Sequence, residues 1–137
     1  MAEIGRRYVL ALMLHPNGTM LDGTALPDAI ARIDAEIAPT PHHYMIGCLY
    51  PRHAQTALQA LRAARPDLVK RVLGLKANAS PLSPEELDKL NHLVGGDVQI
   101  WARDELACAS EFDLVVLGGC CGTDERYIDA LARAATD

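Results

Sequence analysis

The stretch "VVLGGCCGTDERYI", from Val115 to Ile128, joins an apolar run to a polar segment through glycines and paired cysteines. The run "FDLVVLGG", residues 112–119, has the length and composition of a buried strand. A helix is expected to follow it, with Thr123 or Asp124 as its cap. Cys120 and Cys121 therefore stand at the carboxyl end of a strand. In parallel α/β proteins, ligands bind at that end, where the connecting loops meet.

The same alternation of strand and helix occurs four times along the chain. The three earlier strand candidates are "YVLALML", "HHYMIGCLY" and "RVLGLKANA", which cover residues 8–14, 42–50 and 71–79. Segments with the features of helices cover residues 26–38, 51–64, 95–110 and 123–135. The third connection also carries "SPEELDKLNHL", residues 83–93, which opens with the pattern of a capping box. Strands that are apolar almost throughout and alternate with helices predict an α/β fold with a parallel sheet.

Composition places the chain among ordinary soluble domains. Its 137 residues are 50% hydrophobic and 23% charged, so we expect a single domain over residues 1–137. A net charge of −5 and the lack of a basic stripe argue against nucleic acid or an anionic membrane as a partner. We see no signal peptide, and no run approaches the roughly 20 apolar residues of a membrane helix, so a cytoplasmic location is expected.

The positions of the cysteines suggest a metal site. In a reducing compartment, clustered thiols point to metal binding or catalysis more often than to disulfides. Cys48 lies near the end of the second predicted strand, and Cys120 and Cys121 follow the fourth. Three thiols from two strand ends could therefore meet at one edge of the sheet. Three thiolates with an open fourth position are typical of a catalytic zinc site.

Other interpretations of these cysteines remain open at this point. An isolated cysteine is usually a small buried hydrophobic residue, which is our interpretation of Cys108 and an alternative for Cys48. The loop "GGCCGT" could instead cradle an anion at a helix N-terminus, although it lacks the lysine and the spacing of a P-loop. Cys120 or Cys121 could also act as a redox sensor if it is exposed and has a low pKa.

A family resemblance bears on this choice. The segment "GGCCGTDERYIDALA" resembles the signature near the carboxyl end of the homocysteine S-methyltransferases. The segments "YVLALMLHPNGTMLDGTALPDAIARI", "MIGC" and "ANASPLSPEELD" are similar, in order, to further segments of the same family. The resemblance covers nearly the whole chain. It implies a (β/α)8 barrel whose zinc is held by one cysteine after the sixth strand and a vicinal pair after the eighth.

By position, the resemblance makes Cys48, Cys120 and Cys121 the zinc ligands here. Asn78, in "KANAS", falls where the family usually has an asparagine after the seventh strand, and it is expected to help line the substrate site. Gly47 stands where the family commonly has an asparagine before its first cysteine. The thiol is kept, but the hydrogen bond of that asparagine is lost.

The resemblance also implies a reaction. Homocysteine would bind zinc through its sulfur and receive a methyl group from a sulfonium, a quaternary ammonium or a folate, giving methionine. Trp101 could face a cationic donor, but its place among helix residues favours core packing. His15 is close to the end of the first predicted strand, and we interpret it as a loop residue.

Length separates this chain from the family. A barrel of this kind needs about 250 residues, and the chain matches only its second half. The family's residues that hold the amino acid group of homocysteine have no counterpart. Because four strands leave two unpaired sheet edges, we expect completion by a second copy or by a separate amino-terminal half chain. A fragment with an open sheet is the third possibility. The alternative function is a non-catalytic or regulatory half-barrel that retains metal binding or only the fold.

Overall fold

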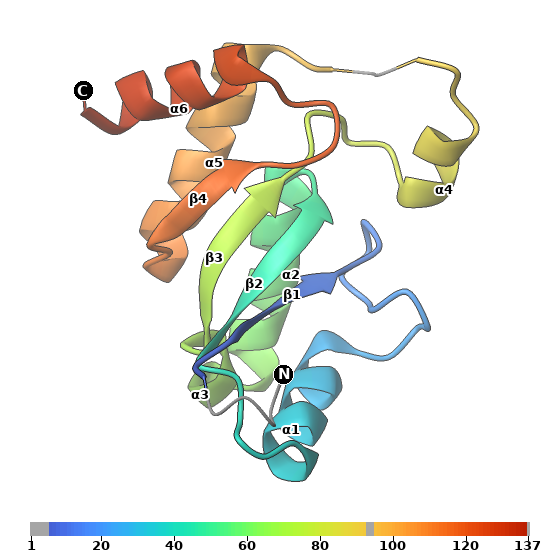
Figure 1. Cartoon of the computed structure of the whole chain (residues 1–137), viewed down its shortest axis with the longest axis vertical. Helices are drawn as coiled ribbons and strands as arrows, with labels where there is room; N and C mark the ends of the chain where they lie inside the picture. The colour runs from blue at the N-terminus through green and yellow to red at the C-terminus, as the bar shows by residue number, and fades with distance from the viewer. Residues whose placement is uncertain (1–5, 93–94, 137) are drawn as a thin grey trace.

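A four-stranded parallel sheet forms the centre of the molecule (Figure 1). The structure is a computed structural model that describes residues 6–92 and 95–136. Each strand pairs in parallel with the next one along the chain. The strands lie in the sheet order β1 (Val9–Met13), β2 (His43–Leu49), β3 (Val72–Ala77) and β4 (Val116–Gly119). This confirms the predicted α/β fold, and the arrangement is consistent with half of a TIM-type barrel.

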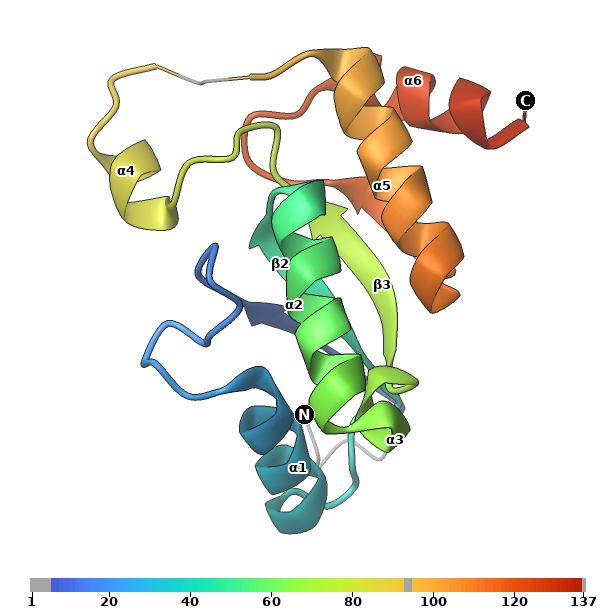
Figure 2. The same cartoon turned by 180° about the vertical axis from the view of Figure 1, so that it is seen from behind.

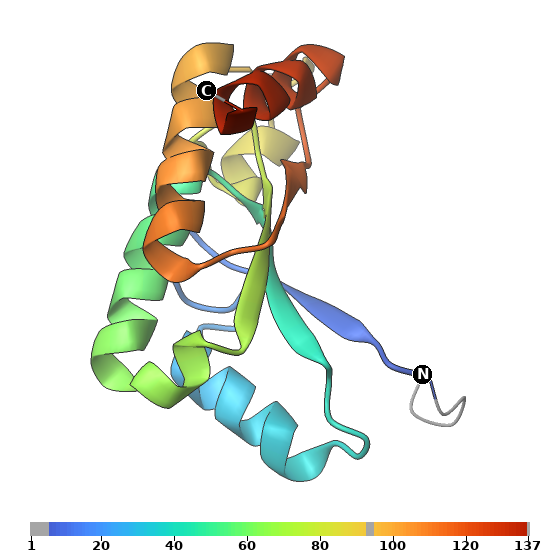
Figure 3. The same cartoon turned by 90° about the vertical axis from the view of Figure 1, so that its left-hand side faces the viewer.

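Helices connect the strands, and the two longest of them cover one face of the sheet (Figure 2). The helices are α1 (Leu26–Glu36), α2 (Pro51–Ala64), α3 (Pro66–Val69), α4 (Pro84–Asp88), α5 (Val98–Phe112) and α6 (Glu125–Thr136). Figure 2 shows α2 and α5 in front of the sheet, and α6 contacts α5 and β4. The short α3, which follows α2 after a single residue, was not predicted. Seen edge-on in Figure 3, the opposite face of the described sheet carries no helix.

Several helix starts follow from local sequence. Ser83 and Glu86 form the predicted capping box: the Glu86 amide donates to Ser83 Oγ over 3.2 Å, and the Ser83 amide donates to Glu86 Oε2 over 2.7 Å. Asp97 caps α5 by accepting from two amides of its first turn. Of the two candidates for the cap of α6, Asp124 accepts from the Arg126 amide. The predicted short helix ends earlier than expected, at Asp88, and its last predicted residue, Leu93, lies outside the described residues.

The boundary between α5 and β4 differs from the prediction. Residues 112–119 were predicted as a strand, but α5 continues to Phe112 and the strand begins at Val116. Phe112 is buried in the core, and the Arg62 guanidinium lies 4.7 Å from its ring centroid. Asp113 then ends the helix in a left-handed conformation with φ of 55°. A buried phenylalanine suits a helix end as well as a strand start, so the apolar run alone could not separate the two elements.

The two faces of the sheet have different environments. Leu12, Ile46 and Leu75 point to the helices and are almost fully buried. The other face carries Val9 and Val116, which are 38% and 40% exposed. In a closed barrel this second face would be the interior, so the four strands leave an apolar surface uncovered.

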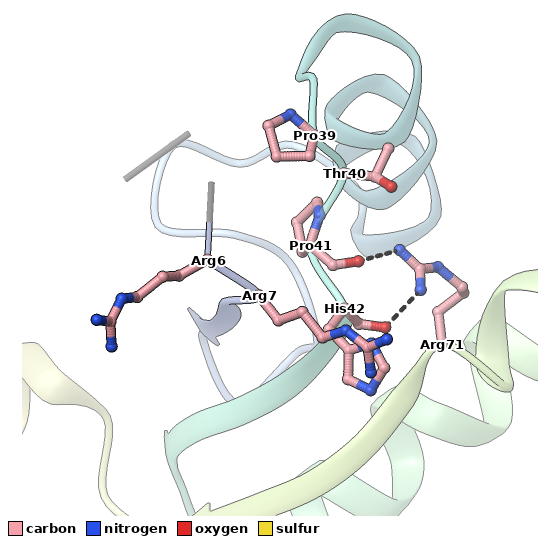
Figure 4. A pocket seen from close by; sticks show the side chains of 7 residues that line it. All are labelled: Arg6, Arg7, Pro39, Thr40, Pro41, His42 and Arg71. Carbon is pink, nitrogen blue, oxygen red and sulfur yellow. Dashed lines mark hydrogen bonds between the residues drawn. The ribbon is translucent and has the colours of Figure 1, made fainter. Parts of the chain in front are cut away.

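Arg71, which directly precedes β3, forms hydrogen bonds to the segment before β2 and to α1. Its guanidinium donates to the carbonyls of Pro41 and His42 over 2.8 and 2.9 Å (Figure 4). It also donates to the carboxylate of Asp34. The Arg71 hydrogen bonds hold the pKa of the Asp34 carboxyl below its usual value. A pocket of about 350 Å³ lies beside this network. The side chains of Arg6 and Arg7 diverge there, so the basic groups do not converge on one point.

Candidate metal centre

Three cysteines meet at the carboxyl ends of β2 and β4. The sulfur atoms of Cys48, Cys120 and Cys121 all lie within 4.8 Å of one another, and the Sγ atoms of Cys48 and Cys120 are 2.7 Å apart. Cys48 and Cys120 are half-buried, whereas Cys121 is exposed. The structure thus brings together the thiols that the sequence placed at two separate strand ends.

A bulge in β2 positions Cys48. The register between β2 and β3 shifts between Gly47 and Leu49, so Cys48 is the extra residue. Its φ is 53°, a left-handed conformation that residues with a side chain seldom adopt. Bulges of this kind redirect a side chain at the edge of a site. The segment "MIGCLY" contains no residue type that signals the bulge, and sequence reasoning missed it.

Backbone hydrogen bonds fix the loop that carries the vicinal pair. The Cys120 amide donates to the Ala77 carbonyl over 2.8 Å, and the Ala79 amide donates to the Cys121 carbonyl over 3.0 Å. The Thr123 hydroxyl donates to the Cys120 carbonyl over 2.7 Å. A Cβ at Gly119 would overlap the Thr123 side chain, so a glycine is required there. The loop therefore has one well-defined conformation beneath its thiols.

Asn78 connects the two cysteine segments. Its Nδ2 donates to the Cys48 carbonyl over 3.0 Å, and its Oδ1 accepts from the Cys121 amide over 3.1 Å. The residue is only 2% exposed. Because the two ends of its amide group bond the two cysteine segments, Asn78 holds these segments in position relative to each other. That it also lines a substrate site stays a prediction.

Trp101 supports Asn78 from the helix side. Its indole Nε1 donates to the Asn78 carbonyl over 2.9 Å, and its ring packs edge-to-face on Tyr127 with centroids 5.2 Å apart. Trp101 is fully buried, which confirms the prediction that it packs in the core. The hydrogen bond to Asn78 was not foreseen, although a buried indole N–H usually has an acceptor.

The environment separates the pKa values of the two closest thiols. Burial, together with the hydrogen bond to Cys120, raises the pKa of Cys48. Burial also acts to raise the pKa of Cys120. Hydrogen bonds from the Cys48 thiol and the Cys121 amide outweigh it, so the pKa of Cys120 is lowered. The positive charge of Lys76 acts in the same direction. Cys120 is therefore the first thiol of the pair to become a thiolate, the form that binds metal.

The donor set fits zinc. Tetrahedral zinc with Zn–S bonds of about 2.3 Å holds its sulfur ligands about 3.8 Å apart. The described sulfurs, separated by 2.7 Å at the closest pair and by no more than 4.8 Å, bracket that spacing. Three thiols with one exposed side leave room for a fourth ligand from solution. Cys108 takes no part: it is fully buried in the core, where burial raises its pKa to about 12, and its interpretation as a buried hydrophobic residue is confirmed.

The comparison with known families agrees with this geometry. The model of the family described as "Homocysteine S-methyltransferase" matches residues 1–135. The chain belongs to the homocysteine S-methyltransferase family. This membership indicates a homocysteine S-methyltransferase-like function and makes the cysteine cluster its candidate metal centre. No individual curated protein matches the chain. Across the described residues of this family member, no helix is both long enough and apolar enough to pass through a bilayer.

Two groups near the centre of this methyltransferase-family chain were not predicted. Glu105 on α5 is fully buried. Its Oε1 accepts from the Gly118 amide over 3.0 Å, and its Oε2 has no hydrogen-bond partner among residues 6–92 and 95–136. Desolvation raises the pKa of Glu105 to about 8. Lys76 on β3 is exposed near the thiols. Glu105 could have been found from the sequence, because it lies on the same helical face as Trp101 and Cys108.

The histidines have no part in the candidate centre. His15 lies in the loop after β1, as predicted, with its Nδ1 3.4 Å from Glu85 Oε1. His42 and His43 lie at the amino end of β2, whereas Cys48 is near its carboxyl end.

Proposed function

We propose that this chain is the zinc-bearing half of a homocysteine S-methyltransferase, with Cys48, Cys120 and Cys121 as the ligands. The observation that carries the proposal is the meeting of three sulfurs within 4.8 Å at two strand ends. Membership of the family supports it. Thiol ligands also suit a reducing compartment, so we place the protein in the cytoplasm.

Zinc held by the three cysteines would supply one chemical function, which is to lower the pKa of a thiol substrate so that it reacts as a thiolate. The protein's own residues prepare the site for this. The bulge at Cys48 and the loop of Cys120 and Cys121 aim the sulfurs, and Asn78 keeps the two segments at a fixed distance. The exposed side of Cys121 admits the substrate sulfur. The homocysteine thiol would lose its proton to solvent, its sulfur would form a bond to the methyl group of an activated donor as the donor's own bond to that methyl breaks, and methionine and the demethylated donor would leave.

The remaining four strands of a barrel lie outside this sequence. We propose that they come from a second copy or from a separate chain, and that residues 1–137 act as one domain in that assembly. A separate amino-terminal half chain would also bring the family's binding groups for the amino acid part of homocysteine, whereas a second copy of this chain would complete the sheet without them. If no such strands join the chain, the alternative is a metal-binding half-barrel without catalysis.

Metal analysis tests the centre. We expect about one zinc per purified chain, bound as three thiolates with one exchangeable position. Cys120→Ala should contain essentially none, whereas the control Cys108→Ala should retain it, because that thiol lies in the core. Equal zinc content in wild type and Cys120→Ala would contradict the proposal.

Two further measurements separate the alternatives. Alkylation of the thiols with and without zinc distinguishes a metal ligand from a redox sensor: ligands should be protected by zinc, and equal reactivity would count against metal binding. Transfer of a methyl group to homocysteine by the zinc-loaded protein, alone or with a candidate partner, separates the enzyme from the non-catalytic half-barrel. Zinc binding without any homocysteine binding would leave only the latter.

A further inference from the structure

Lys76 is a cation on the uncovered face of the sheet. Its neighbours in β3, Leu75 and Ala77, are fully buried against the helices. Since side chains alternate along a strand, Lys76 points to the opposite face, and it is exposed there. It forms no ion pair with any residue in ranges 6–92 and 95–136. The charge is therefore available to a ligand.

Glycines flank Lys76 on both sides. Across the sheet, Lys76 pairs with Gly47 of β2 and with Gly118 of β4. Neither neighbour has a side chain to cover the lysine, and the position of a Cβ at Gly118 faces open space. Lys76 and these two residues form a row across the sheet, here called the glycine row, in which neither neighbouring position covers the lysine.

The glycine row precedes the thiols along the strand direction. Cys120 comes two residues after Gly118, roughly 7 Å further along the strand direction. An extended lysine side chain spans a similar distance.

We propose that the Lys76 ammonium binds the carboxylate of the thiol substrate, so that the site selects thiols carrying a carboxylate a few carbons from the sulfur. This rests on the proposed function, because the substrate sulfur must be at the cysteine cluster. With its sulfur there, a short amino acid thiol can lay its carboxylate over the glycine row. Lys76 then supplies, from this chain itself, a contact for the amino acid part of homocysteine.

Thiol binding to the full chain loaded with cobalt(II) tests this assignment, since replacement of the fourth ligand by a thiol changes the visible absorption of the metal. We compare homocysteine with aminopropanethiol, the same molecule without its carboxylate. Wild type should bind homocysteine more tightly. Lys76→Met should lose about tenfold in homocysteine affinity, the size expected for one hydrogen bond to a charged group, and change little for aminopropanethiol. Lys76→Arg should retain part of the preference, and Lys70→Met, which alters a distant exposed lysine, should match wild type.

The outcomes distinguish the two proposals. If no thiol changes the spectrum of wild type, the proposed function fails and the role of Lys76 fails with it. If thiols bind but wild type and Lys76→Met show the same preference for the carboxylate, only the role of Lys76 is overturned. Equal losses of affinity for both thiols in Lys76→Met, or a loss of its metal, would also overturn the proposal, because Lys76 would then only balance the charge of the cysteine thiolates. A changed mass in solution without a changed preference would assign it to an interface and also overturn the proposal.

Discussion

One amide side chain holds the candidate centre together. Asn78 donates to the Cys48 carbonyl and accepts from the Cys121 amide, so a single residue sets the spacing of two segments that are far apart in sequence. It is itself anchored through its carbonyl by Trp101. Groups that orient metal ligands in this way typically affect affinity by 10- to 100-fold. The thiols depend on Asn78 for their geometry even though it contributes no sulfur.

Replacement of Asn78 should therefore weaken metal binding. For Asn78→Ala we expect roughly a tenfold or greater loss in zinc affinity, measured by competition with a chromophoric chelator. Because the substitution removes the buried Asn78 amide group and leaves the Cys121 amide without its acceptor, the free energy of unfolding should also fall by about 1–3 kcal/mol. The control Asn91→Ala removes an exposed amide and should change neither quantity. Unaltered zinc affinity in Asn78→Ala would show that the two loops hold their positions without it.

At the scale of elements, the packing of α5 on β4 includes a buried acid. Glu105 accepts from the Gly118 amide through one oxygen, and within the part of the chain that the structure describes its other oxygen has no partner. Desolvation raises the pKa of this carboxyl to about 8. The ordinary value is 4.5. Between these two values the folded protein keeps a proton that the unfolded chain releases. The folded state is therefore destabilised progressively as the pH rises through this range.

Glu105→Gln should remove this pH dependence, since glutamine keeps the acceptor for the Gly118 amide and carries no charge. Near pH 4.5 the variant and wild type should be about equally stable. By pH 8 the variant should be more stable by several kcal/mol, on the order of 4 kcal/mol from the pKa difference. Urea unfolding of the metal-free protein at several pH values measures this. The exposed Glu125→Gln serves as the control, and parallel curves for wild type and Glu105→Gln would contradict the assignment.

The elements themselves could largely be predicted from the sequence. Apolar runs of strand length, separated by segments of helical periodicity, predicted β1 to β4 and the longer helices. A strand that is buried on both faces is apolar almost throughout, and a helix that is buried along one stripe repeats its apolar residues every three or four positions. The end of α5 at Phe112 could not be predicted in this way, because Phe112 packs against Arg62 of α2, a contact that residue order does not record. The bulge at Cys48 is set by pairing with β3, a contact that residue order does not record.

The candidate site was predictable for a different reason. Parallel strands bring their carboxyl ends to one edge, so Cys48 and the Cys120–Cys121 pair could be placed together without coordinates. Which groups support the thiols could not. The roles of Asn78 and Lys76 depend on the register of β3 against both neighbouring strands, and register is fixed by the packed sheet as a whole.

The whole molecule has a sheet that is covered on one side only. Helices pack on one face, while the other presents Val9, Met13 and Val116, which are 38%, 41% and 40% exposed. The outer edges of β1 and β4 pair with no other strand of the described residues. In an eight-stranded barrel, this face would be filled by the interior side chains of four more strands. Apolar surface and free strand edges together favour association.

We therefore expect the chain alone to form a dimer or a larger assembly through this face, as measured by light scattering over a range of concentrations. Val116→Glu places a charge on the uncovered face of an edge strand and should weaken association by at least about tenfold, since an unpaired charge in an apolar contact costs more than 1.4 kcal/mol. Ile100→Glu is the matched control: Ile100 is 39% exposed, but it belongs to α5 on the helix side. Because the thiols lie at the ends of the strands rather than on this face, Val116→Glu should still bind zinc. A monomeric wild type at all concentrations, or equal effects of the two substitutions, would show that the uncovered face does not drive assembly.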